Sequence, residues 1–236
     1  IDCLKSTPLY LDAIDLLQPQ FIEYIQHRSF KLIIGGERTS ESLLKKLDEH
    51  GALLDIYSHY GPTETAVGSC GLLCDSRYDL IGKPFANTQC YILDNHLNPL
   101  PIGAIGELYI GGAGVARGYL NQPELTQARF INNPFGTGRL YKTGDLVRYL
   151  PDGNLEYIGR NDFQVKIRGF RVELGEIEHV MQQYQGIVQT TVQYYTEPKS
   201  ALAAYYVSSD EIDETALQAH LFKHLPDYMI PNLSLI

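Results

Sequence analysis

Apolar positions in the first 60 residues alternate between strand-like and helix-like patterns. The run 30–34 is almost continuously apolar and ends at two glycines, which predicts a buried strand followed by a turn. The leucines within 43–47 share one face of a helix, and the run 53–57 predicts a second strand. This strand–helix–strand order predicts an α/β layer with a mainly parallel sheet, which we expect to extend to about residue 80.

Shorter runs follow up to residue 161. The runs 90–93, 107–110 and 154–158 alternate apolar and polar positions, and turns rich in Asn, Pro and Gly separate them. This pattern predicts a β-rich subdomain over about residues 80–161, either a barrel or a small sheet.

The last third of the chain has a third pattern. Apolar residues recur at helical spacing over 174–184, strand-like runs lie between 187 and 207, and an amphipathic helix is predicted over 214–225. We therefore expect residues 162–236 to form a small α+β subdomain, separate from residues 1–161. The fold class that the whole pattern predicts is α/β with a smaller α+β part.

The composition excludes several classes of protein. A chain of 236 residues with 44% hydrophobic residues can form a packed core, which excludes global disorder. Its net charge of −9 disfavours a general nucleic-acid binder, because such a protein needs a basic face. No apolar run approaches the roughly 18 residues of a membrane span. We expect a protein that binds neither nucleic acid nor a membrane.

The cysteines do not indicate a metal site. Cys3, Cys70, Cys74 and Cys90 form no CxxC pair and have no histidine at metal-ligand spacing. We interpret them as small buried apolar residues, and free thiols favour a reducing, cytoplasmic location. The chain begins at Ile1 without a signal segment, and we expect it to be a piece of a longer protein.

The string Tyr-Gly-Pro-Thr-Glu-Thr at 60–65 is the most distinctive motif of the chain. Glycine and proline predict a tight turn directly after a strand, where open α/β sheets bind their ligands. The turn presents Glu64 between the hydroxyls of Thr63 and Thr65, a set that suits Mg²⁺ and phosphate oxygens. The alternative is an ordinary turn without a ligand.

A glycine-rich run at 111–118 follows a predicted strand and partly fits a dinucleotide-binding fingerprint. Residues 119–123 do not predict the long helix that this fingerprint requires, so the dinucleotide interpretation is weak. The chain also contains no GxxxxGK[ST] phosphate-binding loop.

Two further segments carry candidate binding chemistry. Asp145 follows a glycine turn, and a single carboxylate can accept both hydroxyls of a ribose. Lys166 and Arg168 occupy alternate positions of a predicted strand, which fits a strand that faces phosphate. The alternatives are a solvated turn aspartate and an edge strand with salt bridges.

Four motifs, at 60–64, 106–119, 141–145 and 159–173, occur in an order that resembles the adenylation domain of non-ribosomal peptide synthetases. This family belongs to the adenylate-forming superfamily. The resemblance implies that an amino acid and ATP form an aminoacyl-adenylate with Mg²⁺, and that the phosphopantetheine arm of a carrier domain then takes the aminoacyl group. Carrier and condensation domains of the same assembly line are the implied partners.

The resemblance also assigns roles to residues. The residues that it places around ATP are Gly35, Gly36, Tyr60, Thr63, Asp145, Tyr157 and Arg160. Within this set, Gly35, Gly36 and Tyr60 would line the adenine, and Asp145 would take the ribose hydroxyls. Thr63 would contact phosphate and Glu64 would hold Mg²⁺. Asp162 would be the hinge between the two parts, and Lys166 would face the site during thioester formation.

Six positions correspond to the side-chain pocket of these domains: Lys5, Ile33, Gly35, His59, Val67 and Gly68. A buried lysine without a partner is costly, so the pocket should hold an anion. The set resembles that of aspartate-activating domains, with Lys5 and His59 holding the side-chain carboxylate of L-aspartate; asparagine is the next candidate. Alternatively, Lys5 bends to solvent or pairs with Asp2, and His59 is polar packing.

Parts of the family pattern are absent. The phosphate-binding loop and the amino-group aspartate are expected upstream, and residues 225–231 resemble the approach to a terminal lysine that the chain does not reach. We expect the C-terminal half of an adenylation domain, cut at both ends and inactive by itself. The alternatives are an acyl- or aryl-CoA ligase of the same superfamily and a non-catalytic nucleotide-binding fragment.

Overall fold

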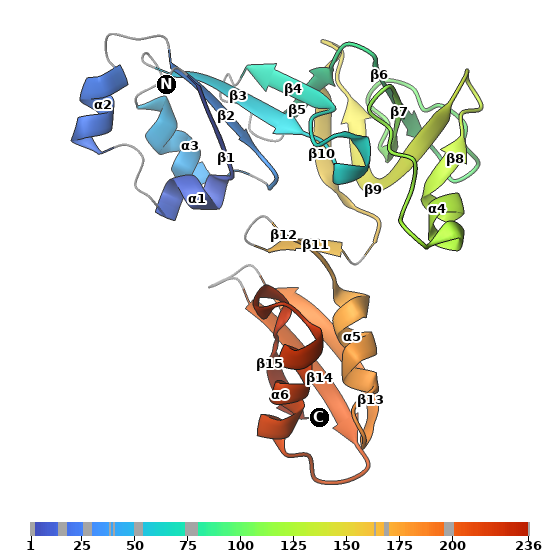
Figure 1. Cartoon of the computed structure of the whole chain (residues 1–236). Helices are drawn as coiled ribbons and strands as arrows, with labels where there is room; N and C mark the ends of the chain where they lie inside the picture. Colours follow the sequence, from blue (N-terminus) through green and yellow to red (C-terminus); the bar gives the residue numbers. More distant parts are fainter. Residues whose placement is uncertain are drawn as a thin grey trace. The chain divides into compact units, whose positions relative to one another are not determined.

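The structure is a computed structural model (Figure 1). It describes residues 3–13, 18–25, 30–37, 39, 41–49, 54–73, 80–162, 164–167, 170–195 and 201–235. The chain divides into two compact units, Ile1–Asn161 and Asp162–Ile236.

The first unit contains a ten-stranded sheet in the order β1-β2-β3-β4-β5-β10-β9-β7-β6, with β8 paired to β9. Its strands are β1 (Cys3–Ser6), β2 (Phe30–Gly35), β3 (Leu54–Tyr60), β4 (Cys70–Leu73), β5 (Leu80–Pro84), β6 (Thr88–Leu93), β7 (Gly106–Gly112), β8 (Phe130–Asn132), β9 (Arg139–Tyr149) and β10 (Leu155–Arg160). The short helices of this unit are α1 (Pro8–Ala13), α2 (Pro19–Ile25), α3 (Glu41–Asp48), η2 (Thr63–Thr65) and α4 (Pro123–Arg129).

The sheet is parallel over β1, β2 and β3 only. Every second residue of β2 is apolar and buried against α1 and α3. These residues form one hydrophobic cluster with Leu11, Leu43 and Leu47 of the two helices. This confirms the predicted helical face and the predicted strand at 30–34. Because the helices cover this face, residues at the intervening positions of β2 lie on the other face of the sheet.

From β4 onward all pairings in this unit are antiparallel. The predicted runs at 90–93, 107–110 and 154–158 correspond to β6, β7 and β10. Apolar side chains from these strands and from the end of β3 form one buried cluster of Tyr60, Cys70, Ile81, Ile92, Leu108, Ile110, Val147 and Leu155. The antiparallel part is therefore joined through β4 and β5 to the parallel layer, in one continuous sheet.

The cysteines differ in their burial. Cys70 is fully buried as predicted, Cys90 is half-buried with its Sγ 3.5 Å from that of Cys70, and Cys3 is exposed on β1. The prediction of burial is wrong for Cys3 because β1 ends the order of paired strands, and the position of Cys3 faces solvent. Cys74, together with Asp2 and Arg168, lies outside the described residues.

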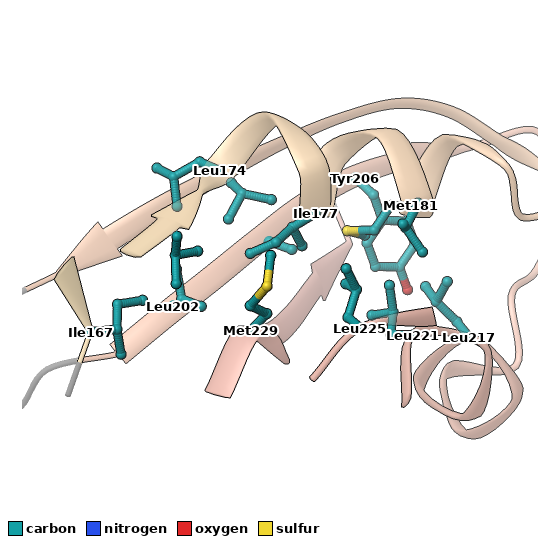
Figure 2. Packing of buried hydrophobic residues seen from close by; sticks show 14 residues of the cluster. Ile167, Leu174, Ile177, Met181, Leu202, Tyr206, Leu217, Leu221, Leu225 and Met229 are labelled. Carbon is teal, nitrogen blue, oxygen red and sulfur yellow. The ribbon is translucent and has the colours of Figure 1, made fainter. Parts of the chain in front are cut away.

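The second unit has a hairpin and a small sheet. Its elements are β11 (Gln164–Ile167), β12 (Phe170–Glu173), α5 (Leu174–Gln182), β13 (Ile187–Tyr195), β14 (Ala201–Ser208), α6 (Glu214–His224), η3 (Asp227–Met229) and β15 (Asn232–Leu235). Alternate residues of β13 and β14 face α5 and α6, and Figure 2 shows Ile177, Met181, Tyr206 and Leu221 packed together with Met229. The predicted helices and strands of this part are observed.

In the described part of the chain, no helix is long and apolar enough to cross a membrane.

Candidate active site

The loop after β3 has a tightly bonded backbone. Ser69 N donates to Tyr60 O at 2.8 Å and closes the loop, and the hydroxyls of Thr65 and Ser69 lie 2.7 Å apart. Ala66 and Val67 both have positive φ, 63° and 68°. Such non-glycine residues cost about 1–3 kcal/mol each and persist only where the surrounding structure determines the backbone. The loop is therefore a well-determined support for Glu64 and Thr63.

Tyr60, at the end of β3, meets the carboxylate of Asp145 from β9. The phenol of Tyr60 donates to Asp145 Oδ2, and Arg160 forms an ion pair with Oδ1. Arg160 Nη2 also donates to Thr143 O at 3.1 Å. Burial and the negative charge of Asp145 raise the pKa of Tyr60, so its phenol stays protonated and donates. The contacts unite three predicted residues in one buried cluster.

A bulge brings Arg160 to this position. The register between β10 and β9 shifts between Tyr157 and Gly159, after which Arg160 lies opposite Asp145. A bulge of this kind re-aims the side chains beyond it. Tyr157, before the bulge, is half-buried against the apolar cluster of the antiparallel strands.

The turn that carries Asp145 is fixed by neighbours that the motifs did not indicate. Thr143 Oγ1 donates to Leu108 O at 2.7 Å and accepts the backbone N–H of Asp145 at 3.0 Å. The buried carboxylate of Glu107 accepts the N–H of Gly144 at 3.0 Å. Of these contacts, the sequence could have indicated only that of Glu107, because a charged residue inside an apolar strand needs a polar partner.

Glu64 has a second residue of the 106–119 motif as its partner. Tyr119 Oη donates to Glu64 Oε1 at 2.6 Å, and Ala116 N donates to the Glu64 carbonyl at 2.8 Å. Tyr119 was assigned no role from the sequence. Thr63, next to Glu64, is exposed.

The Glu64 carboxylate is chemically suited to the Mg²⁺ that the sequence resemblance implies. Mg²⁺ is usually held by one or two carboxylates together with substrate phosphates and water. Within the described ranges no group of three or more His, Cys, Asp or Glu side chains gathers at one place. A half-buried carboxylate beside an exposed hydroxyl is a donor set of the kind that Mg²⁺ takes with a nucleotide.

Four predicted pocket residues lie on one face of the parallel strands. Lys5 pairs with Ile33, and Gly35 pairs with His59, so all four are on the face opposite the helices. A Cβ on Gly68 would lie 3.9 Å from His59 Nδ1, which places this loop residue beside them. Lys5 is exposed, so the expectation of a buried lysine is wrong, and Val67 is exposed as well.

The imidazole of His59 is the most informative group on this face. Its ring packs edge-on against Phe85 with centroids 5.1 Å apart, and its Nδ1 is buried without a hydrogen-bond partner. Burial and then the positive charge of Lys5 lower its pKa. The charge of Lys5 thus disfavours protonation of His59, and a buried polar atom on this face lacks a partner.

Gly36 ends β2 with φ 94° and is exposed. Lys166 is exposed on β11, and Asp162 Oδ1 accepts the N–H of Gln164 at 3.3 Å. These last two residues belong to the second unit, whose internal structure alone is described.

Residues 1–120 match the family described as AMP-binding enzyme. The chain is 46% identical over 213 residues to bacitracin synthase 3 of Bacillus licheniformis, covering 86% of this chain and 3% of that protein. It is 41% identical over 240 residues to the dimodular nonribosomal peptide synthase of Bacillus subtilis, covering 98% of this chain and 10% of that protein.

A solved structure, PA1221, described as an NRPS protein containing adenylation and PCP domains, superposes with a TM-score of 0.81 at 27% identity. The superposition covers 99% of this chain and 48% of that chain. The chain thus spans a small part of its sequence relatives and about half of this structural one. It belongs to the AMP-binding enzyme family and, within it, matches the adenylation domains of nonribosomal peptide synthetases.

Proposed function

We propose that the complete domain containing this chain forms an aminoacyl-adenylate. A carboxylate oxygen of the amino acid attacks the α-phosphorus of ATP, and the bond to the bridging oxygen of pyrophosphate breaks. The observation that carries the proposal is that two acidic groups lie at the end of one strand. Glu64 follows β3 in the chain, and Asp145 accepts a hydrogen bond from Tyr60, the last residue of β3. Catalysis here rests on positioning and charge stabilisation rather than on a covalent enzyme intermediate.

Asp145 is proposed to accept the ribose hydroxyls. A carboxylate has about four acceptor sites on its two oxygens, and Tyr60 and Arg160 each use one. Both partners are donors, and together they orient the carboxylate. Tyr60 and the Gly35–Gly36 turn would line the adenine, and Tyr157 would lie beside the nucleotide.

Glu64 is proposed to hold Mg²⁺ together with phosphate oxygens of ATP, and Thr63 to contact phosphate. The bound ion would offset negative charge as pyrophosphate leaves. The well-determined backbone of the loop supports this role because an oriented carboxylate needs no rearrangement when the metal–nucleotide binds.

A second step would transfer the aminoacyl group to the phosphopantetheine thiol of a carrier domain. The relative PA1221 contains an adenylation and a PCP domain, which supports a carrier partner for this chain. Condensation domains of the same assembly line are further proposed partners. We assign Asp162 as the hinge for this step and Lys166 as the residue that faces the site.

L-aspartate is the proposed amino acid. Lys5 and His59 lie on the same face of the sheet, and the orphan Nδ1 of His59 would donate to the substrate carboxylate in its N–H tautomer. The exposed ammonium of Lys5 is available to a side-chain carboxylate at the same place. Asparagine has a similar volume and is the next candidate; because Lys5 is exposed, the preference for aspartate rests on the attraction between opposite charges and not on the cost of a buried lysine.

The test is amino-acid-dependent exchange of pyrophosphate into ATP by the complete domain. We expect aspartate to be the best substrate, and Lys5→Ala to lose aspartate activity far more than activity with a neutral amino acid. Lys45→Ala is the matched control, because Lys45 is an exposed lysine on α3. A parent that prefers a hydrophobic amino acid refutes the pocket assignment, and one that activates only fatty or aryl acids refutes the amino-acid class.

A further inference from the structure

Tyr119 joins two motifs that are far apart in the sequence. Its phenol donates to Glu64 Oε1 at 2.6 Å across 55 positions of the chain, and its oxygen lies 3.5 Å from that of Tyr141 on β9. The Tyr119 side chain therefore links Glu64 to β9, the strand that carries Asp145. Residues 60–64 are thus linked to β9 in two ways: directly by Tyr60 with Asp145, and indirectly through Tyr119, which contacts both Glu64 and Tyr141.

The position of the Tyr119 ring is itself fixed. The ring packs edge-on against Phe130 with centroids 5.4 Å apart, and its backbone N–H donates to Thr126 Oγ1 at 2.9 Å. Each of these contacts restricts a different part of the residue. The phenol is therefore held in one place relative to the loop that carries Glu64.

The backbone next to Tyr119 also contacts this loop. Ala116 N donates to the Glu64 carbonyl at 2.8 Å, and Arg139 Nη2 donates to the Ala116 carbonyl at 2.8 Å. A Cβ on Gly114 would lie 3.1 Å from Thr65 O, so the two segments approach closely. Segment 114–119 thus holds the main chain of Glu64 while Tyr119 holds its carboxylate.

We propose that Tyr119 is a positioning residue that fixes the Glu64 carboxylate for the metal–nucleotide complex. The proposal rests on the proposed function. The phenol donates one hydrogen bond to one carboxylate oxygen and thereby sets the rotation of the group about its last bond. A partner that orients a metal-binding carboxylate typically changes metal affinity by about 10- to 100-fold when it is removed.

The phenol is suited to this task because it stays neutral. A tyrosine side chain ordinarily has a pKa of about 10, so the phenol is protonated at neutral pH and donates to Glu64. A lysine in its place would compete with the metal by its charge. A phenylalanine would keep the ring packing and remove only the donor.

The experiment compares Tyr119→Phe with the parent in the complete domain, with Mn²⁺ as the probe ion. Binding of Mn²⁺ in the presence of a non-hydrolysable ATP analogue is followed by electron paramagnetic resonance. We expect Tyr119→Phe to raise the Mn²⁺ dissociation constant roughly 10- to 100-fold and to leave the melting temperature near that of the parent. In pyrophosphate exchange, the KM for Mg²⁺ should rise while kcat at saturating Mg²⁺ is retained.

Tyr91→Phe is the control. The Tyr91 phenol, also half-buried in the antiparallel strands, contacts Gln89 at 3.4 Å, and its ring stacks on Phe135. We expect it to bind Mn²⁺ as the parent does. In a double-mutant cycle, Tyr119→Phe should add little to Glu64→Gln, because the group that it positions is then gone.

Equal Mn²⁺ affinity in the parent and in Tyr119→Phe overturns this inference alone. So does a loss of kcat and melting temperature without a change in metal dependence, which would make Tyr119 a packing residue. A parent that binds no metal–nucleotide complex overturns the proposed function and this inference together.

Discussion

At the scale of single residues, the group of Asp145, Tyr60 and Arg160 is both a buried ion-pair cluster and the proposed ribose site. Asp145 is 5% exposed and is paired with a cation whose side chain is 11% exposed. Removing one member of a buried pair leaves the other uncompensated, which typically costs about 3–5 kcal/mol. A neutral isostere keeps the volume of the side chain but also leaves Arg160 without its counter-charge, so stability has to be measured together with binding.

We predict that Asp145→Asn in the complete domain raises the KM for ATP roughly 10- to 150-fold, because a hydrogen bond to a charged group contributes about 1.5–3 kcal/mol. Both variants should lower the free energy of unfolding, and Asp145→Ala should lower it more because it also loses the packing and the acceptor for Tyr60. ATP-dependent pyrophosphate exchange and urea unfolding measure the two effects. Asp210→Asn, at an exposed position of the second unit, serves as control. An unchanged KM for ATP in Asp145→Asn would remove Asp145 from the ribose site.

The pH dependence of stability provides a second prediction at this scale. Burial and Lys5 lower the pKa of His59 from its ordinary value of 6.5, so the unfolded chain binds this proton more readily than the folded one. The contribution of His59 is therefore present above pH 6.5 and is lost as the pH falls through the folded-state pKa. We expect His59→Gln to flatten the decrease of the urea midpoint between neutral and mildly acidic pH.

Lys5→Met tests the cause of this shift. Without the lysine charge the pKa of His59 should rise, and Lys45→Met should leave it unchanged. An NMR titration of the His59 imidazole measures this directly. Identical titration curves for the parent and Lys5→Met would place Lys5 too far from His59 to share a ligand with it.

At the scale of elements, the loop after β3 holds Val67 in a left-handed conformation that β-branched residues rarely adopt. We predict that Val67→Gly keeps or increases the free energy of unfolding, by up to about 1 kcal/mol, because relief of strain offsets the greater freedom of glycine in the unfolded chain. Val188→Gly, at an exposed position of strand β13, should instead be destabilising. Chemical unfolding measures the free energy of unfolding of both variants. A large loss of stability in Val67→Gly would contradict the inference that the backbone of Val67 is strained.

Elements with a clear apolar period were predictable from the sequence, and those defined by their partners were not. The spacing of apolar residues located α5, the nearly continuous apolar run before two glycines located β2, and a strand-like run located β13. Strands β1, β4, β5 and β8 have three to five residues and acquire their identity from pairing. The motifs likewise contain Asp145 and Glu64, the two carboxylates of the proposed site, while their supports Thr143 and Tyr119 depend on contacts 35 and 55 positions away.

At the scale of the whole molecule, the boundary between the compact units lies between Asn161 and Asp162. We predict that trypsin cleaves the complete domain after Lys166 rather than after Arg160, because Lys166 is exposed and the Arg160 side chain is buried in its ion pair. If Asp162 is a hinge, ATP with the amino acid should change the cleavage rate. If the rate of cleavage at Lys166 is the same with and without ATP and the amino acid, this would argue against Asp162 as the hinge.

The most direct test of the proposed activity is detection of the aminoacyl-adenylate itself. The complete domain is incubated with Mg²⁺, ATP and aspartate, and the products are identified by mass spectrometry, alongside the Glu64→Gln and Asp145→Asn variants. We predict aspartyl-AMP and pyrophosphate from the parent and strongly reduced amounts from both variants. A parent that forms no adenylate with any amino acid, or variants that form it as fast as the parent, would contradict the proposed activity and its site.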